Sequence, residues 1–259
     1  MAYITMLSGM WMYALGNATM NQIITLGVLS RLIAALAMPE LSDDIYRFIW
    51  DGLVSSNGLN PYEYTPREII LMGEGQLAPG SITLFPLLNS PDYHTVYPPV
   101  IQAFNLSAVW ISGGDIQGSA IYMKLVSALA DTGSIMILAR ILIQCNITNQ
   151  LRLALFALNP LLILEVSANG HHEGFILFFL LTMIYNLMKS RNFIGGIMLG
   201  AAIGVKLTPV ILVPTIIAFL IRKGGSGRFI AGTCISAGIL LFPLADPIVR
   251  NAILKSTWL

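Results

Sequence analysis

One short segment, PELSDDIYRFIWDG at positions 39–52, contains several carboxylates that can accept a proton and an arginine that can neutralise negative charge. If this segment is helical, Asp44, Arg47 and Asp51 lie at i, i+3 and i+7 and share one face. A carboxylate placed beside a cation is suited to act as a general base, and Asp43 offers a second carboxylate next to Asp44. The segment is therefore a candidate for acid–base chemistry.

The same segment also fits a purely structural interpretation. Ser42 can cap a helix N-terminus, and acidic residues in the first turn suit the positive end of the helix dipole. The remaining face carries apolar residues for contact with lipid, which are Ile45, Phe48 and Ile49. An amphipathic helix at the membrane surface has this pattern. These residues alone leave both interpretations open.

A second set of polar residues interrupts two apolar segments, SANGHHEG at 167–174 and KLTP at 206–209. Ionisable residues between membrane helices are functional candidates. The candidates for substrate binding here are Asn169, His171, His172, Glu173 and Lys206. Lys206 either extends its ammonium group to the membrane interface or meets an anion. Adjacent histidines do not share a helix face as histidines four positions apart do, so a zinc site is not favoured.

Two proline-containing stretches offer further candidates for binding. NPYEYTP at 60–66 forms a rigid turn, or a loop that closes over substrate with Asn60 and Tyr62. HTVYPPV at 94–100 is an ordinary helix start, or a cavity wall that includes Tyr97 and His94.

These candidates are set in a chain that is typical of an integral membrane protein. Of its 259 residues 56% are hydrophobic and 10% are charged, and the mean hydropathy is +0.75. Soluble domains carry about 25% charged residues. The apolar runs are continuous and do not alternate, which favours membrane helices over a β-barrel. The net charge of +1 argues against a nucleic-acid partner. The apolar composition makes membrane lipid the expected surrounding.

We predict a single all-α, polytopic membrane domain over residues 1–259, with about eight or nine transmembrane or partly inserted helices. Its parts are N-terminal helices (1–38), one long extracytoplasmic loop with a short interfacial helix (39–96), a helical bundle (97–245) and a C-terminal end (246–259). The apolar candidates fall at about 2–16, 22–38, 97–112, 119–143, 151–166, 172–188, 193–206, 207–221 and 229–245.

Lysine and arginine set the expected orientation. They concentrate in two short connections, MKSRN at 188–192 and IRKGGSGR at 221–228, which we place in the cytoplasm. The 39–96 loop, with eight acidic residues and two arginines, then faces outward, as do the two polar interruptions. Four apolar spans between that loop and MKSRN would return the chain to the wrong side. One of them, with 97–112 as the candidate, is therefore expected to be re-entrant or partly inserted.

Two apolar stretches have lengths that do not fit whole membrane crossings. Residues 193–223 would form about 46 Å of helix at 1.5 Å per residue, too long for one crossing and too short for two. Asn159-Pro160 breaks the other stretch, 151–188. Irregular backbone at membrane depth needs protein or water around it. We therefore infer a polar vestibule in the outer half of the bundle, with SANGHHEG and KLTP at its floor.

Two acidic residues lie inside apolar runs, Asp131 and Glu165. A buried carboxylate needs a partner, and Arg31 and Arg140 also lie in apolar runs. We expect helix-packing hydrogen bonds between these groups.

Several motifs follow one another in an order that resembles a known family. They are RLIAALAMPELSDDIYRFIWDG (31–52), GLNPY (58–62), YPP (97–99), ALNPL (157–161), ANGHHEG (168–174) and GVKLTP (204–209). The chain resembles polytopic GT-C-type glycosyltransferases, in particular bacterial mannosyltransferase-like proteins that use polyprenyl-phosphate-linked sugar donors. The resemblance spans about residues 22–223, and SDDxYR followed by NPY and YPP is its most specific part.

The resemblance implies a catalytic acidic residue in the first large extracytoplasmic loop, which corresponds to Asp43 or Asp44. It would act as general base on the acceptor hydroxyl in an inverting transfer. The leaving phosphate needs positive charge nearby. The candidates for that charge are Arg47 and Lys206, with His171 and His172 as weaker ones.

The implied donor is a polyprenyl-phosphate-linked hexose, with mannose the expected sugar, and the acceptor is a glycan or a lipid-linked acceptor. The site would face the extracytoplasmic side of the bacterial cytoplasmic (inner) membrane. The sequence contains no nucleotide-binding glycine-rich loop, which agrees with a lipid-phosphate donor. No cofactor is implied, and assistance by a divalent metal is left open.

Two other interpretations compete with this one. A membrane transporter also has broken helices and buried charge, although inverted repeats are absent from the sequence and the acidic residues gather in one loop. The enzymes that the chain resembles are longer, with further membrane helices after the equivalent of residue 245. The chain is therefore expected to be short at its C-terminus, and an inactive relative is the third hypothesis.

Overall fold

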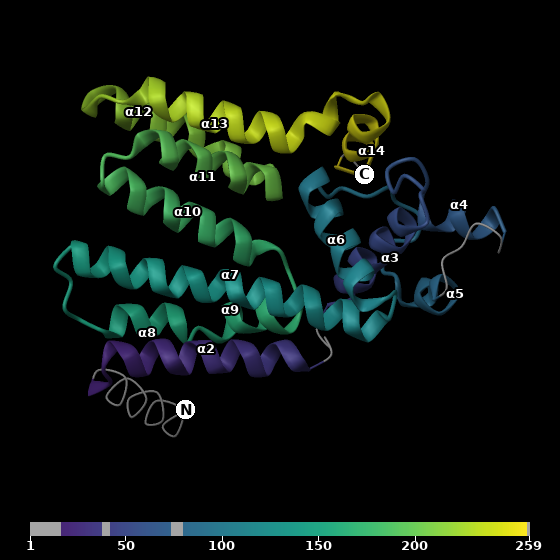
Figure 1. The fold of residues 1–259 in the computed structure, drawn as a ribbon, viewed down its shortest axis with the longest axis horizontal. Helices are drawn as coiled ribbons and strands as arrows, with labels where there is room; N and C mark the ends of the chain where they lie inside the picture. The colour runs from purple at the N-terminus through teal and green to yellow at the C-terminus, as the bar shows by residue number, and fades with distance from the viewer. Residues whose placement is uncertain (1–16, 38–41, 74–79, 258–259) are drawn as a thin grey trace, which may run out of the picture.

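The computed structural model describes residues 17–37, 42–73 and 80–257, and every regular element within these ranges is a helix. The predicted apolar segment at 2–16 lies outside the described residues. The helices that run side by side along the molecule (Figure 1) are α2 (Met20–Leu36), α7 (Ile116–Gln144), α10 (Glu173–Met188), α11 (Asn192–Val205) and α13 (Ser226–Leu241). The predicted all-α architecture is confirmed.

The bundle is built from successive helix pairs: α2 packs on α7, α7 on α10, α10 on α11 and α11 on α13 (Figure 1). A broken helix lies beside α2 and α7. Its parts are α8 (Leu151–Ala157), α9 (Pro160–Leu162) and a π-helix (Ile163–Ala168). After α11, a 3-10 turn (Thr208–Leu212) leads into α12 (Val213–Lys223). The two stretches of unsuitable length are therefore divided, as the sequence predicts.

The remaining helices gather at one end of the bundle, on the right in Figure 1, which we call the loop end. They are α3 (Asp44–Ser56), α4 (Pro66–Leu71), α5 (Ser81–Leu84), α6 (Pro99–Ser112) and α14 (Pro247–Thr257). Because α6 packs on α3 at this end, it does not run along the bundle with the other helices, and a re-entrant or partly inserted 97–112 segment stays a prediction. The connections 169–172 and 206–207 reach the loop end, whereas the basic connections 188–192 and 223–226 lie at the opposite one (Figure 1).

Helix length limits how many of these elements can cross a membrane. Among the described residues, three helical stretches are long and apolar enough to do so: Ile116–Gln144, Leu151–Ala168 and Ser226–Ala245. The apolar helices α2, α10 and α11 are shorter. The structure thus supports an all-α membrane protein but not the predicted eight or nine spans, because prolines and polar turns divide the apolar sequence into shorter helices.

One buried arginine holds three helices together. Arg31 Nε in α2 donates to Asp131 Oδ2 in α7 at 2.7 Å, and neither side chain is exposed. Arg31 Nη1 donates to the main-chain oxygen of Ala157, the last residue of α8, and to that of Gly27 in its own helix. The last carbonyls of a helix lack intrahelical donors, so Arg31 satisfies one of them inside the bundle. The predicted pair of Asp131 with Arg31 is confirmed.

Glycines let α11 lie directly against α13. A Cβ on Gly196 would be 2.1 Å from the main-chain oxygen of Phe229, and one on Gly200 would be 2.7 Å from that of Thr233. Small residues four positions apart allow membrane helices to approach this closely. The contact fixes α11, and Lys206 follows directly after it.

One expectation about α3 is wrong. Ile45, Phe48 and Ile49 are at most 1% exposed and pack in a protein core with residues of α6 and α7, so they do not face lipid. The reason is a close approach of α3 to α6: a Cβ on Gly52 would be 2.5 Å from the main-chain oxygen of Asn105. The helix is therefore part of the folded core at the loop end.

Replacing Asp131 by leucine should destabilise the protein strongly, because Arg31 would stay buried without its carboxylate. Breaking a buried pair from one side costs about 3–5 kcal/mol. We expect a clearly lower midpoint of thermal unfolding in detergent. The double variant Asp131→Leu with Arg31→Met removes both charges and should recover part of the loss. A single variant as stable as the parent chain would contradict this role of the pair.

Candidate functional site

Two adjoining cavities at the loop end share Asp44 and Tyr97 in their walls. The first has a volume of about 280 Å³, and we call it the Arg47 cavity after its other charged side chain. The second has a volume of about 240 Å³, and we call it the Lys206 cavity. The Lys206 cavity is also lined by Phe48, His171, His172, Glu173 and Val205. As predicted, the two polar interruptions meet in one cavity.

The Asp44 carboxylate borders both cavities and has a partner at each oxygen. Asn89 Nδ2 donates to Asp44 Oδ1 at 2.7 Å, and His171 Nε2 lies 3.5 Å from Asp44 Oδ2. The interaction with His171 is the main cause that lowers the pKa of Asp44, while partial burial opposes it. Asp44 is therefore ionised at neutral pH and able to accept a proton.

The start of α3 differs from the prediction in one detail. Asp43, not Ser42, occupies the N-cap position, and the Asp43 side chain makes no capping hydrogen bond. The Ser42 hydroxyl accepts from the main-chain N–H of Asp44 at 3.3 Å and lies 3.1 Å from His171 Nε2. Asp43 is exposed and borders neither cavity. Of the two aspartates, the structure brings only Asp44 to the cavities.

His171 lies between two carboxylates that come from different helices. His171 Nδ1 is 2.7 Å from Glu165 Oε2 in the π-helix, while His171 Nε2 faces Asp44. The main-chain N–H of His171 also donates to the Glu165 carbonyl oxygen at 3.1 Å. Asp44 first, and then Glu165, raises the pKa of His171, and burial opposes them. The expectation that Glu165 pairs with an arginine is wrong, because the π-helix brings its side chain to His171.

His172 has a different environment from its neighbour in sequence. The residue is 5% exposed, and its ring packs against Phe48 and Tyr97 at centroid distances of 4.3 and 5.8 Å. Burial lowers the pKa of His172 to about 4. The ring is therefore neutral at pH 7 and forms a wall of the Lys206 cavity, not a cation in it.

Lys206 carries the accessible positive charge of its cavity. Its Nζ donates to Glu173 Oε1 at 2.7 Å, and the two side chains are 50% and 51% exposed. An exposed ion pair of this kind stabilises a protein by at most about 1 kcal/mol. An anion that enters the cavity can therefore replace Glu173 at little cost.

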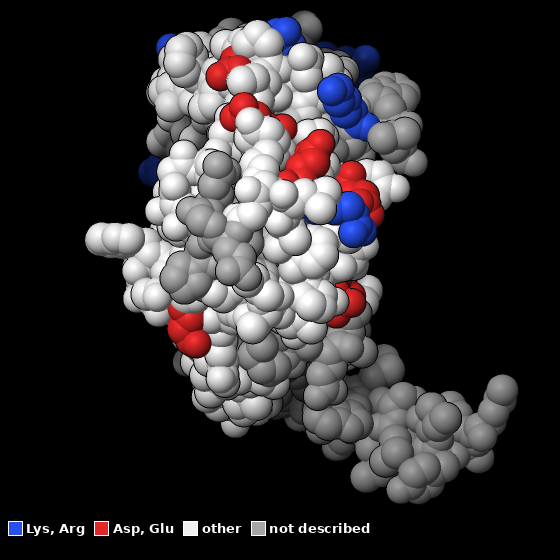
Figure 2. All heavy atoms as spheres, turned by 90° about the vertical axis from the view of Figure 1, so that its right-hand side faces the viewer, with Lys and Arg blue, Asp and Glu red and all other residues white. Residues whose placement is uncertain are grey.

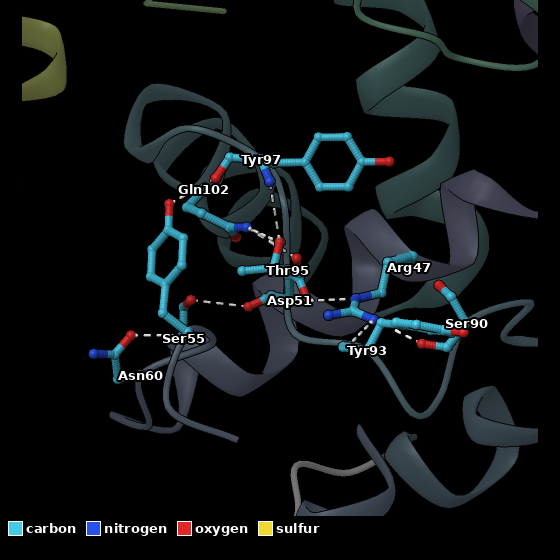
Figure 3. A network of polar contacts seen from close by, with 10 residues as sticks. Arg47, Asp51, Ser55, Asn60, Ser90, Tyr93, Thr95, Tyr97 and Gln102 are labelled. Carbon is cyan, nitrogen blue, oxygen red and sulfur yellow. Dashed lines mark hydrogen bonds and ion pairs between the residues drawn. The ribbon is translucent and has the colours of Figure 1, made fainter. Parts of the chain in front are cut away.

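Arg47 is committed to a buried network (Figure 3). Its Nε donates to Asp51 Oδ1 at 2.9 Å, one turn further along α3. Its Nη1 donates to the main-chain oxygens of Ser90 and Tyr93, both at 2.9 Å. The predicted common face of Asp44, Arg47 and Asp51 is confirmed in that Arg47 lines a cavity with Asp44 and pairs with Asp51.

The same network fixes the segment that carries Tyr97. Gln102 Nε2 in α6 donates to Asp51 Oδ2 at 2.9 Å and to the Thr95 hydroxyl at 2.7 Å (Figure 3). The Tyr62 hydroxyl donates to the main-chain oxygen of Tyr97 at 2.7 Å. Tyr97 is therefore held firmly where the two cavities meet.

Three predicted site residues support the site without lining either cavity, namely Asn60, Tyr62 and Asn169. Asn60 Oδ1 accepts from the main-chain N–H of Tyr62 at 3.0 Å, which stabilises the turn at NPY. Asn169 is 2% exposed and precedes the two histidines. Asp51 is likewise a network residue and not a cavity residue.

The surface of the loop end carries charges of both signs, and Figure 2 faces it directly. Acidic and basic side chains are scattered among uncharged ones, and no broad patch of one sign covers the described part of this face. On this face the charges that can select a charged ligand are therefore those of the cavity side chains.

Sequence reasoning missed two residues that contact the Asp44–His171 pair, Glu165 and Asn89. Glu165 precedes His171 by six positions, and an α-helix does not bring positions six apart onto one face. The wider turn of the π-helix and the loop after it do so here. Asn89 is 45 residues from Asp44, and no local pattern marks it.

Known proteins similar to this chain share one description. Residues 1–222 match the family described as "Alpha-(1->6)-mannopyranosyltransferase, N-terminal domain". Alpha-(1->6)-mannopyranosyltransferase B from Corynebacterium glutamicum is 30% identical over 175 residues, which cover 64% of this chain and 27% of that protein. The match thus spans about a quarter of the relative's length. No solved structure matches the chain significantly.

Replacing Asp51 by asparagine should destabilise the loop end, because it leaves the buried Arg47 guanidinium without a counter-charge. We expect a loss of about 3–5 kcal/mol, measured as a lower midpoint of thermal unfolding in detergent. The matched control is Asp92→Asn, which breaks the exposed pair of Asp92 with Arg67 and should leave the midpoint nearly unchanged. Equal effects of the two substitutions would show that burial of the Arg47–Asp51 pair is unimportant.

Proposed function

Since the chain belongs to the alpha-(1->6)-mannopyranosyltransferase family, we propose that it transfers a mannosyl group from a polyprenyl-phosphate donor to a hydroxyl group of a glycan or lipid-linked acceptor. The observation that carries this proposal is the position of Asp44, an ionised carboxylate in the shared wall of two cavities. One cavity can take the donor and the other the acceptor, with the base between them.

In the proposed reaction Asp44 is the general base. The acceptor hydroxyl loses its proton to Asp44 as its oxygen forms a bond to C1 of the mannosyl group. The bond from C1 to the phosphate oxygen breaks, and the phosphate leaves with the electron pair. A positioned base accelerates such a step by about 10²- to 10⁴-fold. Asp43 lies outside both cavities, which favours Asp44 for this role.

Lys206 is the proposed partner of the leaving phosphate. Its exposed bond to Glu173 is weak enough for a phosphate to replace it. The Arg47 donors Nε and Nη1 are already bonded within the protein, and Arg47 instead fixes the wall of its cavity. His172 is neutral and has no charge to offer. We therefore assign the donor to the Lys206 cavity and the acceptor to the Arg47 cavity.

Inversion has a stereochemical consequence. The acceptor attacks C1 from the face opposite the phosphate, so an α-linked product requires a β-linked donor. The α-linkage is the one that the family description names. Attack and departure on opposite faces also agree with a base that lies between two cavities.

The place of the site supports a lipid-linked donor. Both cavities lie at one end of a bundle of apolar helices, so a polyprenyl chain can stay in the bilayer while its phosphate reaches Lys206. The basic connections lie at the opposite end of the bundle (Figure 1). By the positive-inside rule the site then faces the extracytoplasmic side of the bacterial cytoplasmic membrane.

Asp44→Asn should lower mannosyl transfer from polyprenyl-phosphate mannose by about 10²-fold or more, because the amide cannot accept the proton. Asp43→Asn is the matched control and should keep most of the activity, since its side chain borders neither cavity. The assay uses membranes with equal amounts of inserted protein. Full activity of the Asp44 variant would exclude it as the base.

Cysteine labelling tests the orientation. In a background with Cys145 and Cys234 replaced by serine, Asn57→Cys places an exposed thiol directly after α3, and Lys189→Cys places one directly after α10. These two helix ends lie at opposite ends of the bundle (Figure 1). A membrane-impermeant maleimide should label the Asn57 variant in intact cells and the Lys189 variant only after permeabilisation. Labelling of both from outside would contradict the proposed orientation.

A further inference from the structure

General-base transfer leaves a proton on Asp44, and the cycle can repeat only when that proton is removed. Two further titratable side chains follow Asp44 in a chain of contacts. His171 Nε2 lies 3.5 Å from Asp44 Oδ2, and Glu165 Oε2 lies 2.7 Å from His171 Nδ1. From this geometry we infer that Glu165 and His171 form a proton-accepting pair that regenerates the Asp44 carboxylate. The inference rests on the proposed function and assigns to His171 a role other than binding phosphate.

The contact with Glu165 determines which nitrogen of His171 is available. A carboxylate 2.7 Å from Nδ1 accepts the Nδ1–H, so the neutral ring carries its lone pair on Nε2. Nε2 faces Asp44 Oδ2 at 3.5 Å and the Ser42 hydroxyl at 3.1 Å. Neutral His171 accepts a hydrogen bond from Ser42 and is ready to receive a proton at Nε2. The contact with Asp44 is long, as catalytic hydrogen bonds often are before substrate binds.

Asp44 itself is held in the orientation that this step needs. Asn89 donates to Asp44 Oδ1, which leaves Oδ2 on the side of His171. The proton of the acceptor hydroxyl goes to Asp44 and then to His171 Nε2, and no electrons change hands. The result is an imidazolium between two carboxylates, a stable arrangement because both anions favour the charged ring. The His171 side chain is 21% exposed, so it can then return the proton to water.

The position of Glu165 favours a role for its negative charge in raising the proton affinity of His171. Its side chain is 42% exposed, so packing does not require a carboxylate there. It reaches His171 only because the chain adopts a π-helix over Ile163–Ala168. This conformation is rare in proteins generally, and where it does occur it is often at a functional site. Glutamine at this position would keep a hydrogen-bond acceptor for Nδ1–H but lose the negative charge.

The dependence of activity on pH separates this role from a merely orienting one. The charged or titratable groups around His171 are Asp44, Glu165, His172, Glu173 and Lys206. If His171 must be neutral to receive the proton, kcat falls as pH drops through the pKa of His171, which its two carboxylates hold above the ordinary value of 6.5. If His171 only orients Asp44, the fall of kcat at low pH (the acid limb) instead reflects protonation of Asp44, whose pKa is lowered from its ordinary value of 3.8.

The two roles predict shifts of opposite sign in the variants. If His171 accepts the proton, Glu165→Gln lowers the pKa of His171, and the fall of kcat on the acidic side of the pH profile moves to lower pH. The maximal kcat of this variant falls on the order of tenfold. His171→Gln should move the limb further down, toward the range of an isolated carboxyl group. For an orienting residue, His171→Gln would remove the group that lowers the pKa of Asp44, and the limb would move to higher pH.

The experiment measures kcat and KM for mannosyl transfer against pH in membranes that contain the full chain with Glu165→Gln, His171→Gln or His171→Ala. We expect lower kcat with little change in KM, and recovery of His171→Ala by about tenfold or more in imidazole buffer, since imidazole can replace the missing acceptor. An acid limb that stays fixed or rises, together with no imidazole rescue, would overturn the inference. If Asp44→Asn is inactive while these variants behave as the parent, the pair fails and the proposed function stands. A fully active Asp44→Asn variant removes Asp44 as the base and the pair with it, whereas absence of mannosyl transfer in the parent chain would remove the proposed function.

Discussion

The fold depends on one constraint: a helix that ends inside an apolar bundle leaves main-chain carbonyls that water cannot reach. Two buried cations supply the missing donors. Arg31 donates to the carbonyl oxygen of Ala157, where α8 ends, and Lys124 of α7 donates to that of Ala37, directly after α2. Burying either cation is costly. The two residues therefore mark the places where the chain must leave helical geometry within the bundle.

Both of these breaks lead to the site. The chain after Ala37 continues to α3 and Asp44, and the chain after Ala157 continues through Pro160 into the π-helix that carries Glu165. The carboxylates on the two sides of His171 thus come from segments that begin at the two breaks. Arg31 and Lys124 support the site in this way although neither lines a cavity.

Local patterns in the sequence predicted the parts of this arrangement that depend on spacing and length. They include the common face of Asp44 and Arg47, the break at Asn159-Pro160 and the all-α class. Spacing shows that a face is apolar but not what covers it, so the packing of Phe48 against α6 could not be predicted. The contact of Glu165 with His171 depends on a π-helix, whose register no simple periodicity reveals.

The proposed base and the proposed leaving group are both anions, and anions in neighbouring cavities repel each other. In the proposed mechanism two side chains, Lys206 and His171, offset this repulsion. Lys206 lines the proposed donor cavity beside its partner Glu173, whereas His171 would gain its charge from Asp44 in the proposed proton transfer. In the preceding transfer step the phosphate diester would become a monoester and gain negative charge. In the proposed cycle His171 would thus add positive charge to the cavity after transfer, while the newly formed phosphate monoester is still bound there.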